Sequence, residues 1–179
     1  GQGEPATGRL NVALGALFTD VIMGADDHKV LLGTDAGYGF IGKIGDLYTK
    51  NRAGKAVVSL PKGAKILSPK MVNDANALIA AVSNEGRLLV FPIAELPELA
   101  RGKGNKIINI PGSRLQAREE FVIDYGVISE GDSLVVHSGK RYLVMKAKDL
   151  EHYSGERGRR GHKLPRGFQK VDKLEVEPK

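Results

Sequence analysis

Residues 78–96 read LIAAVSNEGRLLVFPIAEL, in which two aliphatic runs are separated by the polar, glycine-containing segment NEG at 84–86. Short aliphatic runs joined by a few residues that include glycine are typical of β-hairpins. The stretch ends in an acidic-leucine pair and is followed by the basic, glycine-rich loop RGKG at 101–104 and by IINIP, which ends at Pro111. This order of features predicts a hairpin, a single helical turn, a loop and a further strand.

The same features recur in two other parts of the chain. LLGTDAGYGFIGKIGDL begins at Leu31 and SLVVHSGKRYLVMKAKDL begins at Ser133, and each is followed by a basic loop and a proline. The matching positions are the turn glycines Gly37, Gly86 and Gly139, the acidic-leucine pairs at 46–47, 95–96 and 149–150, and the closing prolines Pro61, Pro111 and Pro165. Because these ordered features keep a spacing of about 50 residues, they predict an internal repeat.

The repeat predicts one domain over residues 1–179, a fragment of a longer chain, since the sequence begins without Met and inside a repeat. The copies are expected at about 10–61, 62–111 and 112–179, and residues 1–9 resemble the tail of a preceding copy. The stretch 112–120, which contains two adjacent glutamates, is expected to be a solvated linker.

Strand signals are regular within each copy. Hairpins are expected at 30–34 with 38–43, at 78–83 with 87–91, and at 134–137 with 141–146. Further strands are expected at 56–60 and 106–110 and near 18–23 and 72–73. Single helical turns are expected at 44–49, 93–99 and 147–152. Four short strands per period are typical of a propeller blade, and one blade cannot bury its apolar faces alone. The predicted fold class is all-β, a propeller-like arrangement of four-stranded blades.

Composition removes several classes of function. The 179 residues contain no Cys, which excludes a disulfide scaffold, a thiolate metal site and a cysteine nucleophile. No apolar run approaches the roughly 18 residues of a membrane span. The four histidines are scattered, and GKGNK at 102–106 lacks the spacing of a phosphate-binding loop, so neither a metal site nor a nucleotide site is expected. No set of nucleophile, base and orienting group is visible.

Positive charge gathers at one place in each repeat. The net charge is +6, and lysines and arginines cluster in the glycine-rich loop after each acidic-leucine pair, most strongly between 138 and 173. In a propeller these loops lie on one rim, where they form a basic belt. DNA carries one negative charge per about 1.7 Å, and glycine lets backbone N–H groups approach phosphate closely. The predicted phosphate contacts are Arg52, Lys55, Arg101, Lys103, Lys106, Arg157, Arg159, Arg160 and Lys163, with Lys50, Lys140, Arg141 and Arg166 as weaker candidates.

The kind of DNA binding follows from what the loops lack. Few aromatic residues accompany them, which disfavours stacking on single strands, and no helix offers base readout, so we expect duplex binding without sequence preference. Two other interpretations remain open. One is a protein-interaction propeller that binds an acidic partner; the other is an enzyme with its site at the ring centre, where the repeats place aliphatic residues instead of converging acids or histidines.

RGKGNKIINIP at 101–111 and GERGRRG at 155–161 resemble segments of the C-terminal domain of the A subunit of bacterial DNA topoisomerase IV, in the family that also contains the corresponding gyrase domain. The resemblance extends over essentially the whole chain, although the Gln-Arg-Arg-Gly-Gly-Lys-Gly box of gyrase is absent. It implies a β-pinwheel, in which neighbouring blades exchange strands, as an open or incomplete ring. It also implies that the rim binds and bends duplex DNA and helps to select crossings for decatenation and supercoil relaxation.

The resemblance also implies a division of labour in the parent enzyme. That enzyme is a type IIA topoisomerase, an isomerase that uses ATP and Mg²⁺ and acts in chromosome segregation in the bacterial cytoplasm, at the nucleoid. Its breakage tyrosine, ATPase and metal sites lie outside this segment, so the fragment is expected to hold no catalytic residue and no cofactor. The implied partners are duplex DNA, a second copy of the same topoisomerase chain and the separate chain that carries the ATPase.

Overall fold

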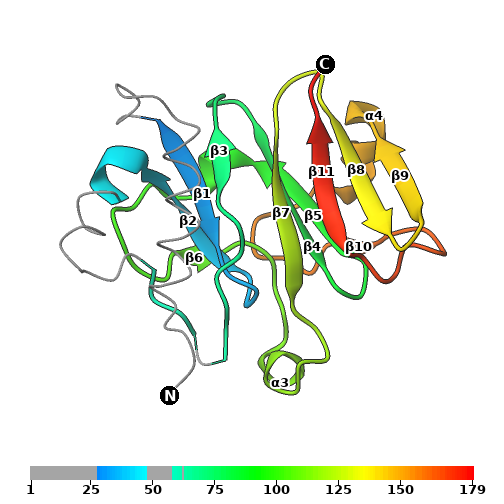
Figure 1. Ribbon diagram of the computed structural model, residues 1–179, viewed down its shortest axis with the longest axis horizontal. Coiled ribbons are helices and arrows are strands. Elements are labelled where there is room, and N and C mark those ends of the chain that lie inside the picture. Colours follow the sequence, from blue (N-terminus) through cyan, green and yellow to red (C-terminus); the bar gives the residue numbers. More distant parts are fainter. Residues whose placement is uncertain (1–27, 48–57, 62) are drawn as a thin grey trace.

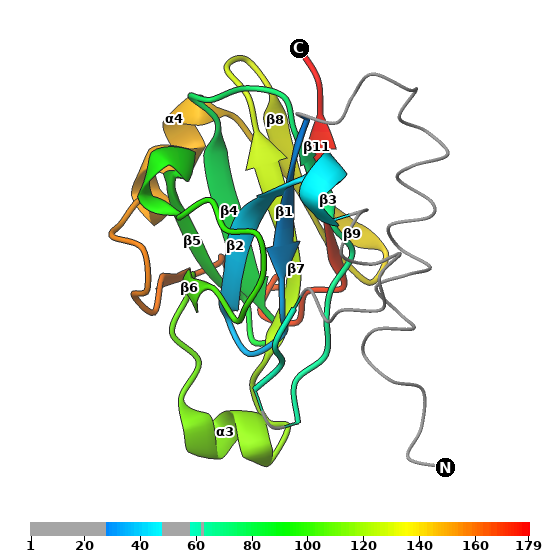
Figure 2. The same ribbon diagram turned by 90° about the vertical axis from the view of Figure 1, so that its left-hand side faces the viewer.

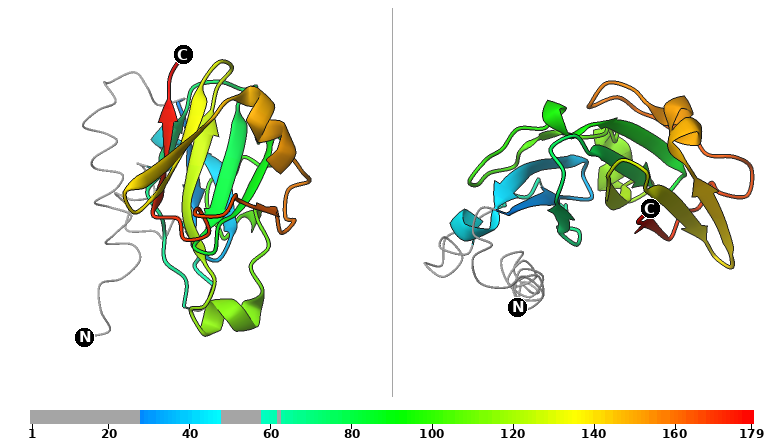
Figure 3. Two further views of the ribbon diagram at one scale, coloured as in Figure 1. Left: turned by 90° about the vertical axis from the view of Figure 1, so that its right-hand side faces the viewer. Right: turned by 90° about the horizontal axis from the view of Figure 1, so that it is seen from above.

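A computed structural model describes residues 28–47, 58–61 and 63–179, which form three antiparallel sheets side by side along an arc (Figures 1 and 3). The strands are β1 Lys29–Gly33, β2 Tyr38–Lys43, β3 Lys70–Val72, β4 Leu78–Ser83, β5 Arg87–Pro92, β6 Asn105–Lys106, β7 Val122–Ile128, β8 Ser133–Ser138, β9 Arg141–Met145, β10 His162–Lys163 and β11 Lys173–Glu177. The helical elements are η1 Ile93–Glu95, α3 Gly112–Gln116, α4 Ala147–Leu150 and η2 Glu151–Tyr153. Figure 2 shows α3 projecting beyond the sheets, at the end where the hairpin turns lie.

The three predicted hairpins are confirmed as β1–β2, β4–β5 and β8–β9. In the first two the glycine N–H closes the turn, from Gly37 to the Thr34 carbonyl and from Gly86 to the Ser83 carbonyl. Both glycines have positive φ, which L-residues adopt at a cost. Short helical turns follow all three hairpins as predicted, the first of them at residues 44–47.

Each sheet is completed by strands that lie far away in the sequence. The orders are β3-β1-β2-β6, β10-β5-β4-β7 and β11-β8-β9. The outer strands β6 and β10 come from the basic loop of the following repeat, with Lys106 opposite Tyr38 and Lys163 opposite Arg87. A repeat therefore lends one strand to the preceding sheet, which is the strand exchange expected of a β-pinwheel.

The inner edge of each sheet is formed by the strand that follows the basic loop. β3 pairs with β1, β7 pairs with β4, and β11 pairs with β8. The strand expected near 72–73 is therefore present, but it belongs beside the first hairpin. In the described residues no strand pairs with the outer edge of β9, so the arc of sheets is open there. Tyr142 and Val144 on β9 are correspondingly 67% and 40% exposed.

Two of the three core clusters lie between neighbouring sheets, and the third covers the other face of the first sheet. Ile79 and Ala81 of β4 face the first sheet, whereas Ala80 and Val82 face the third. Both faces of the middle sheet are therefore buried, which explains the continuous aliphatic run of this strand. The phenol of Tyr125 crosses one interface and donates a 2.6 Å hydrogen bond to the Thr34 carbonyl. Burial raises the pKa of Tyr125 well above its usual value, so the hydroxyl remains a donor.

Gly104, which directly precedes β6, shows how closely this strand approaches β2. It has φ +81°, and a Cβ at this position would overlap the carbonyl of Gly39 on β2. Gly102, two residues earlier, also has positive φ (+119°), but a Cβ there would meet no atom within 4 Å. The pair therefore separates the cost of backbone conformation from the cost of crowding.

We expect Gly104→Ala to destabilise the domain more than Gly102→Ala. Both substitutions pay for the left-handed backbone, about 1–3 kcal/mol, and Gly104→Ala adds crowding against backbone, about 1–3 kcal/mol more. Urea unfolding followed by circular dichroism measures the difference. Equal losses for the two variants would show that β6 tolerates displacement from β2.

Candidate nucleic-acid interface

The residues that follow one basic loop form backbone hydrogen bonds to the basic loop of the next repeat. The Ser59 N–H donates to the Gly102 carbonyl at 2.9 Å, and the Asn109 N–H donates to the Arg159 carbonyl at the same distance. Ser59 and Asn109 each follow the loop of their own repeat, and their partners lie in the loop of the next. One geometry thus occurs at both described junctions, and it places the loops in sequence along the outer edge of the arc.

The third-repeat loop turns two of its arginines inward. Arg157 Nη1 donates to the Lys106 carbonyl at 2.7 Å, and the following Gly158 N–H donates to the Ile107 carbonyl at 2.8 Å. The Nε of Arg157 is buried and has no hydrogen-bond partner among the residues that the structure describes. Arg160 Nη1 donates to the Asn109 carbonyl at 2.9 Å. These two side chains hold the loop against the preceding repeat.

Arg159 and Lys163 point the other way. The Arg159 side chain is 72% exposed, and its one ion-pair partner among the described residues is Glu156 of its own loop, at 3.0 Å. An exposed pair of this kind contributes about 0–1 kcal/mol, so a phosphate can replace the carboxylate at little cost. Lys163 is exposed on β10, whose backbone is fixed by pairing with β5.

Two lysines of the second-repeat loop lie over the ring of Tyr38, which belongs to β2. Lys103 Nζ lies 4.4 Å from the centre of the tyrosine ring and Lys106 Nζ lies 5.9 Å from it. Lys106 also donates to Asn109 Oδ1 at 3.1 Å and is only partly exposed, whereas Lys103 and Arg101 are exposed. Cation–π contact fixes the lysine heads near the ring while leaving them open to solvent.

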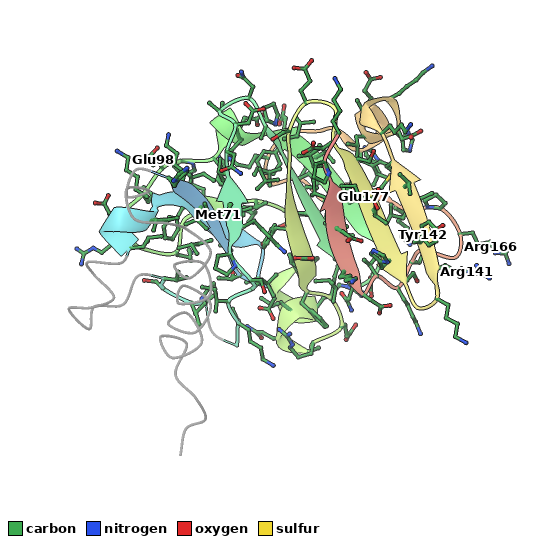
Figure 4. The ribbon with its side chains drawn as sticks, turned by 45° about the horizontal axis from the view of Figure 1, so that its top comes forward. Met71, Glu98, Arg141, Tyr142, Arg166 and Glu177 are labelled. Atoms are coloured by element: carbon green, nitrogen blue, oxygen red, sulfur yellow. The ribbon has the colours of Figure 1, made fainter. Side chains whose placement is uncertain are left out.

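Three of the four weaker candidates lie on or beside the third sheet. Lys140, Arg141 and Arg166 are exposed, and Figure 4 shows Arg141, Tyr142 and Arg166 at the same edge of this sheet, from β9 and the loop after β10. They extend the basic surface beyond the last loop. The predicted contacts Lys50, Arg52 and Lys55 lie outside the described residues.

One of the matching positions predicted for the repeat, the closing proline Pro165, is wrong. The Ile107 N–H donates to the Gly37 carbonyl at 2.6 Å, and the Leu164 N–H donates to the Gly86 carbonyl at 2.8 Å, so Leu164 is the counterpart of Ile107. Pro165 therefore follows at the position of Ile108 and is not the counterpart of Pro111. A lysine followed by a buried aliphatic residue, shared by both loops, is the sequence signal that marks the true register.

The solvated linker expected at 112–120 is confirmed for residues 112, 113 and 116–119, which are exposed, but it is wrong for Glu120. Its last residue, Glu120, is fully buried and accepts hydrogen bonds from Arg114 Nε at 3.2 Å and Arg160 Nη1 at 2.9 Å. Arg118, which has positive φ (55°), pairs with the buried Asp35 at 2.8 Å. This stretch therefore joins the first and second hairpins to the third basic loop.

We also searched the part of the chain that the structure describes for a metal site and for a membrane-spanning helix. It contains no group of three or more His, Asp or Glu side chains placed to hold a metal ion. None of its helices is long and apolar enough to cross a membrane. Three sheets that share strands along an arc, with stacked basic loops on the outer edge, define a propeller-like β-pinwheel domain.

A family model described as "DNA gyrase C-terminal domain, beta-propeller" matches residues 28–73 and 78–124, about half of the chain. The chain belongs to this family of gyrase-type C-terminal domains. It is 53% identical to the A subunit of DNA topoisomerase 4 from Pseudomonas aeruginosa over 178 residues and 42% identical to that of Escherichia coli K12 over 177 residues. In each case 99% of the chain aligns, and it spans about a quarter of the relative (24% and 23%).

Solved structures give the same result. The E. coli ParC C-terminal domain matches with a TM-score of 0.77 and 39% identity, over 99% of this chain and 72% of that one. The C-terminal domain of a DNA topoisomerase IV matches with a TM-score of 0.68 over 88% of this chain and 49% of that one, at 18% identity, which shows the fold alone. The resemblance stated from the sequence is confirmed.

The opposite directions of Arg157 and Arg159 generate a prediction about stability. We expect Arg157→Gln to lower the free energy of unfolding by about 1–3 kcal/mol, because it leaves the Lys106 carbonyl without its partner. Arg159→Gln, the same chemical change two residues away, should change it by less than about 0.5 kcal/mol. Urea titrations of both variants provide the comparison. A larger loss for Arg159→Gln would contradict the inward assignment of Arg157.

Proposed function

We propose that this domain binds duplex DNA along its outer edge, without sequence preference. The observation that carries the proposal is the hydrogen bonding of the segment after one basic loop to the basic loop of the next repeat, which brings cations of the second and third repeats onto a continuous edge. Each outward lysine or arginine gains affinity by releasing counterions from a phosphate. Positive-φ glycines at 102, 104, 158 and 161 keep the loop backbone free of bulky side chains beside those cations.

We further propose that the domain bends the DNA and presents crossings to a type IIA topoisomerase. The relatives are named as the A subunit of DNA topoisomerase 4. On that basis the full-length protein would pair with a second copy of itself and with a separate ATPase chain, and would use ATP and Mg²⁺ for decatenation and relaxation in the bacterial cytoplasm. The described residues offer no cluster fit for Mg²⁺, so no step through the metal is assigned to this domain.

A triple substitution tests the edge. Changing Lys103, Arg159 and Lys163 to Gln should weaken binding to all duplex sequences about equally. It should also reduce the slope of log Kd against log salt by about 0.9 for each phosphate that the domain no longer neutralises. Fluorescence anisotropy with two unrelated duplexes over a range of salt concentrations measures both quantities.

A control with the same change in net charge is available at the other end of the sheets. Lys29 and Lys43 lie at the ends of β1 and β2 that are far from the hairpin turn, and they pair with Glu98 at 2.9 and 3.7 Å. Lys179 follows β11 and donates its N–H to Asp132, at the corresponding end of the third sheet. Changing these three to Gln should leave the salt slope nearly unchanged. If both triple variants behave alike, the edge is not the DNA site. If the wild-type domain does not retard duplex DNA in a gel at low salt, the result favours the other interpretation, a protein-interaction propeller that binds an acidic partner.

DNA bending by the domain can be measured separately from DNA binding. A duplex of about 150 bp, one persistence length, closes into a circle slowly because bending is costly. We expect the domain to accelerate ligase-catalysed circularisation of such a fragment, and the triple variant at Lys103, Arg159 and Lys163 to lose the effect. Binding without faster circularisation would remove bending from the proposal and leave DNA binding intact.

A further inference from the structure

The buried carboxylate of Glu120 connects the candidate DNA edge to the core of the repeat. It is fully buried and receives hydrogen bonds from arginines on two different elements, Arg114 in α3 and Arg160 in the third basic loop. A buried carboxylate is costly unless it is paired on all sides, so this residue is a fixed point to which both arginines are held.

Arg114 extends the connection to the middle sheet. Its guanidinium contacts Glu85, which lies in the turn between β4 and β5, and also Glu119 at 3.4 Å. Backbone bonds from the N–H groups of Glu119 and Glu120 to the Arg114 carbonyl close the segment on itself. The carboxylate of Glu120 is thus held on the same rigid hairpin that receives β10.

Arg160 connects the Glu120 carboxylate to the third basic loop. The same Nη1 bonds the Glu120 carboxylate and the Asn109 carbonyl, each at 2.9 Å. Its neighbour Arg159 accepts the Asn109 N–H through its carbonyl and sends its side chain outward. On the other side, Gly161 packs so closely on Leu88 that a Cβ would lie 2.6 Å from that carbonyl oxygen. With 160 and 161 anchored, the directions of Arg159 and Lys163 are set.

We propose that Glu120 and Arg160 are positioning residues for DNA binding, and that this buried acid raises the affinity of the domain for a polyanion. The inference rests on the proposed function. It reassigns Arg160 from the predicted phosphate contacts, since that side chain is only 32% exposed and its bonded nitrogen points into the domain. Glu120 acts through the loop and touches no phosphate itself.

The sign of the effect distinguishes this role from plain electrostatics. Removing a negative charge beside a DNA site strengthens binding when the charge acts only through its field. Glu120→Gln removes that charge but also releases Arg160 from its charged partner. Positioning predicts weaker DNA binding, by about fivefold or more, while the salt slope stays close to that of the wild type because no phosphate contact is deleted.

Glu119→Gln is the matched control. Glu119 is the adjacent residue, carries the same charge and contacts Arg114, but its side chain is 58% exposed and it makes no bond to Arg160. Its substitution should leave DNA affinity unchanged or slightly higher. Weaker binding by Glu120→Gln together with unchanged binding by Glu119→Gln supports the proposal. Unchanged or tighter binding by Glu120→Gln overturns it.

A double-substitution cycle separates positioning from general loss of structure. If Glu120 acts by directing Arg159 and Lys163, Glu120→Gln should cost little affinity when both of those residues are already Gln. A full loss in that background would mean that Glu120 does not act through them. A wild-type domain that fails to bind duplex DNA would instead refute the proposed function, so the two failures are distinguishable.

A second pair of variants applies if Glu120→Gln does not fold. Arg160→Lys keeps the charge but presents a single ammonium in place of the guanidinium that binds both Glu120 and Asn109. It should weaken DNA binding about fivefold, whereas Arg159→Lys should bind like the wild type because a phosphate accepts either cation. Equal, near-wild-type binding by both lysine variants would overturn the proposal, because binding would not depend on the guanidinium that holds Glu120 and Asn109.

Discussion

The pairing of each lent strand with the preceding hairpin is the constraint on which the rest of the structure depends. β6 and β10 are only two residues long, yet each places a whole basic loop on a neighbouring sheet. Lys106 opposite Tyr38 and Lys163 opposite Arg87 set the register. A buried aliphatic residue follows each of these lysines and anchors the strand in the core. The position of surface charge is therefore decided by backbone pairing and apolar burial.

The same constraint explains why the edge is continuous. The middle sheet is buried on both faces, so it is stable only between its neighbours, and the first two sheets are each completed by a strand from the next repeat. Sheets joined in this way cannot slide independently. Their loops therefore keep a constant relation to one another, which lets separate cations act as one surface for a long, regular ligand.

Much of this arrangement was predictable from the sequence, because hairpins depend on local alternation and on glycine turns. The bounds of β2 and β4 match those expected. β7 was not expected, since Asp124 and Gly126 interrupt its apolar pattern and the strand is stabilised by pairing with β4. The burial of Glu120 was also missed. Its partner Arg160 lies 40 residues further along the chain, and no local pattern reports a contact of that range.

Charge in the basic loops divides into two kinds that composition cannot distinguish. In GERGRRG, Arg157 and Arg160 bind carbonyl and carboxylate acceptors inside the domain, whereas Arg159 pairs with the exposed Glu156 at the surface. An inward guanidinium contributes rigidity, and an outward one can neutralise a phosphate and so release counterions from the DNA. Affinity for DNA then depends on both kinds, because an outward cation on a loose loop loses entropy on binding that an anchored one has already lost in folding. An acid that anchors the loop, such as Glu120, can in this way favour the binding of an anion.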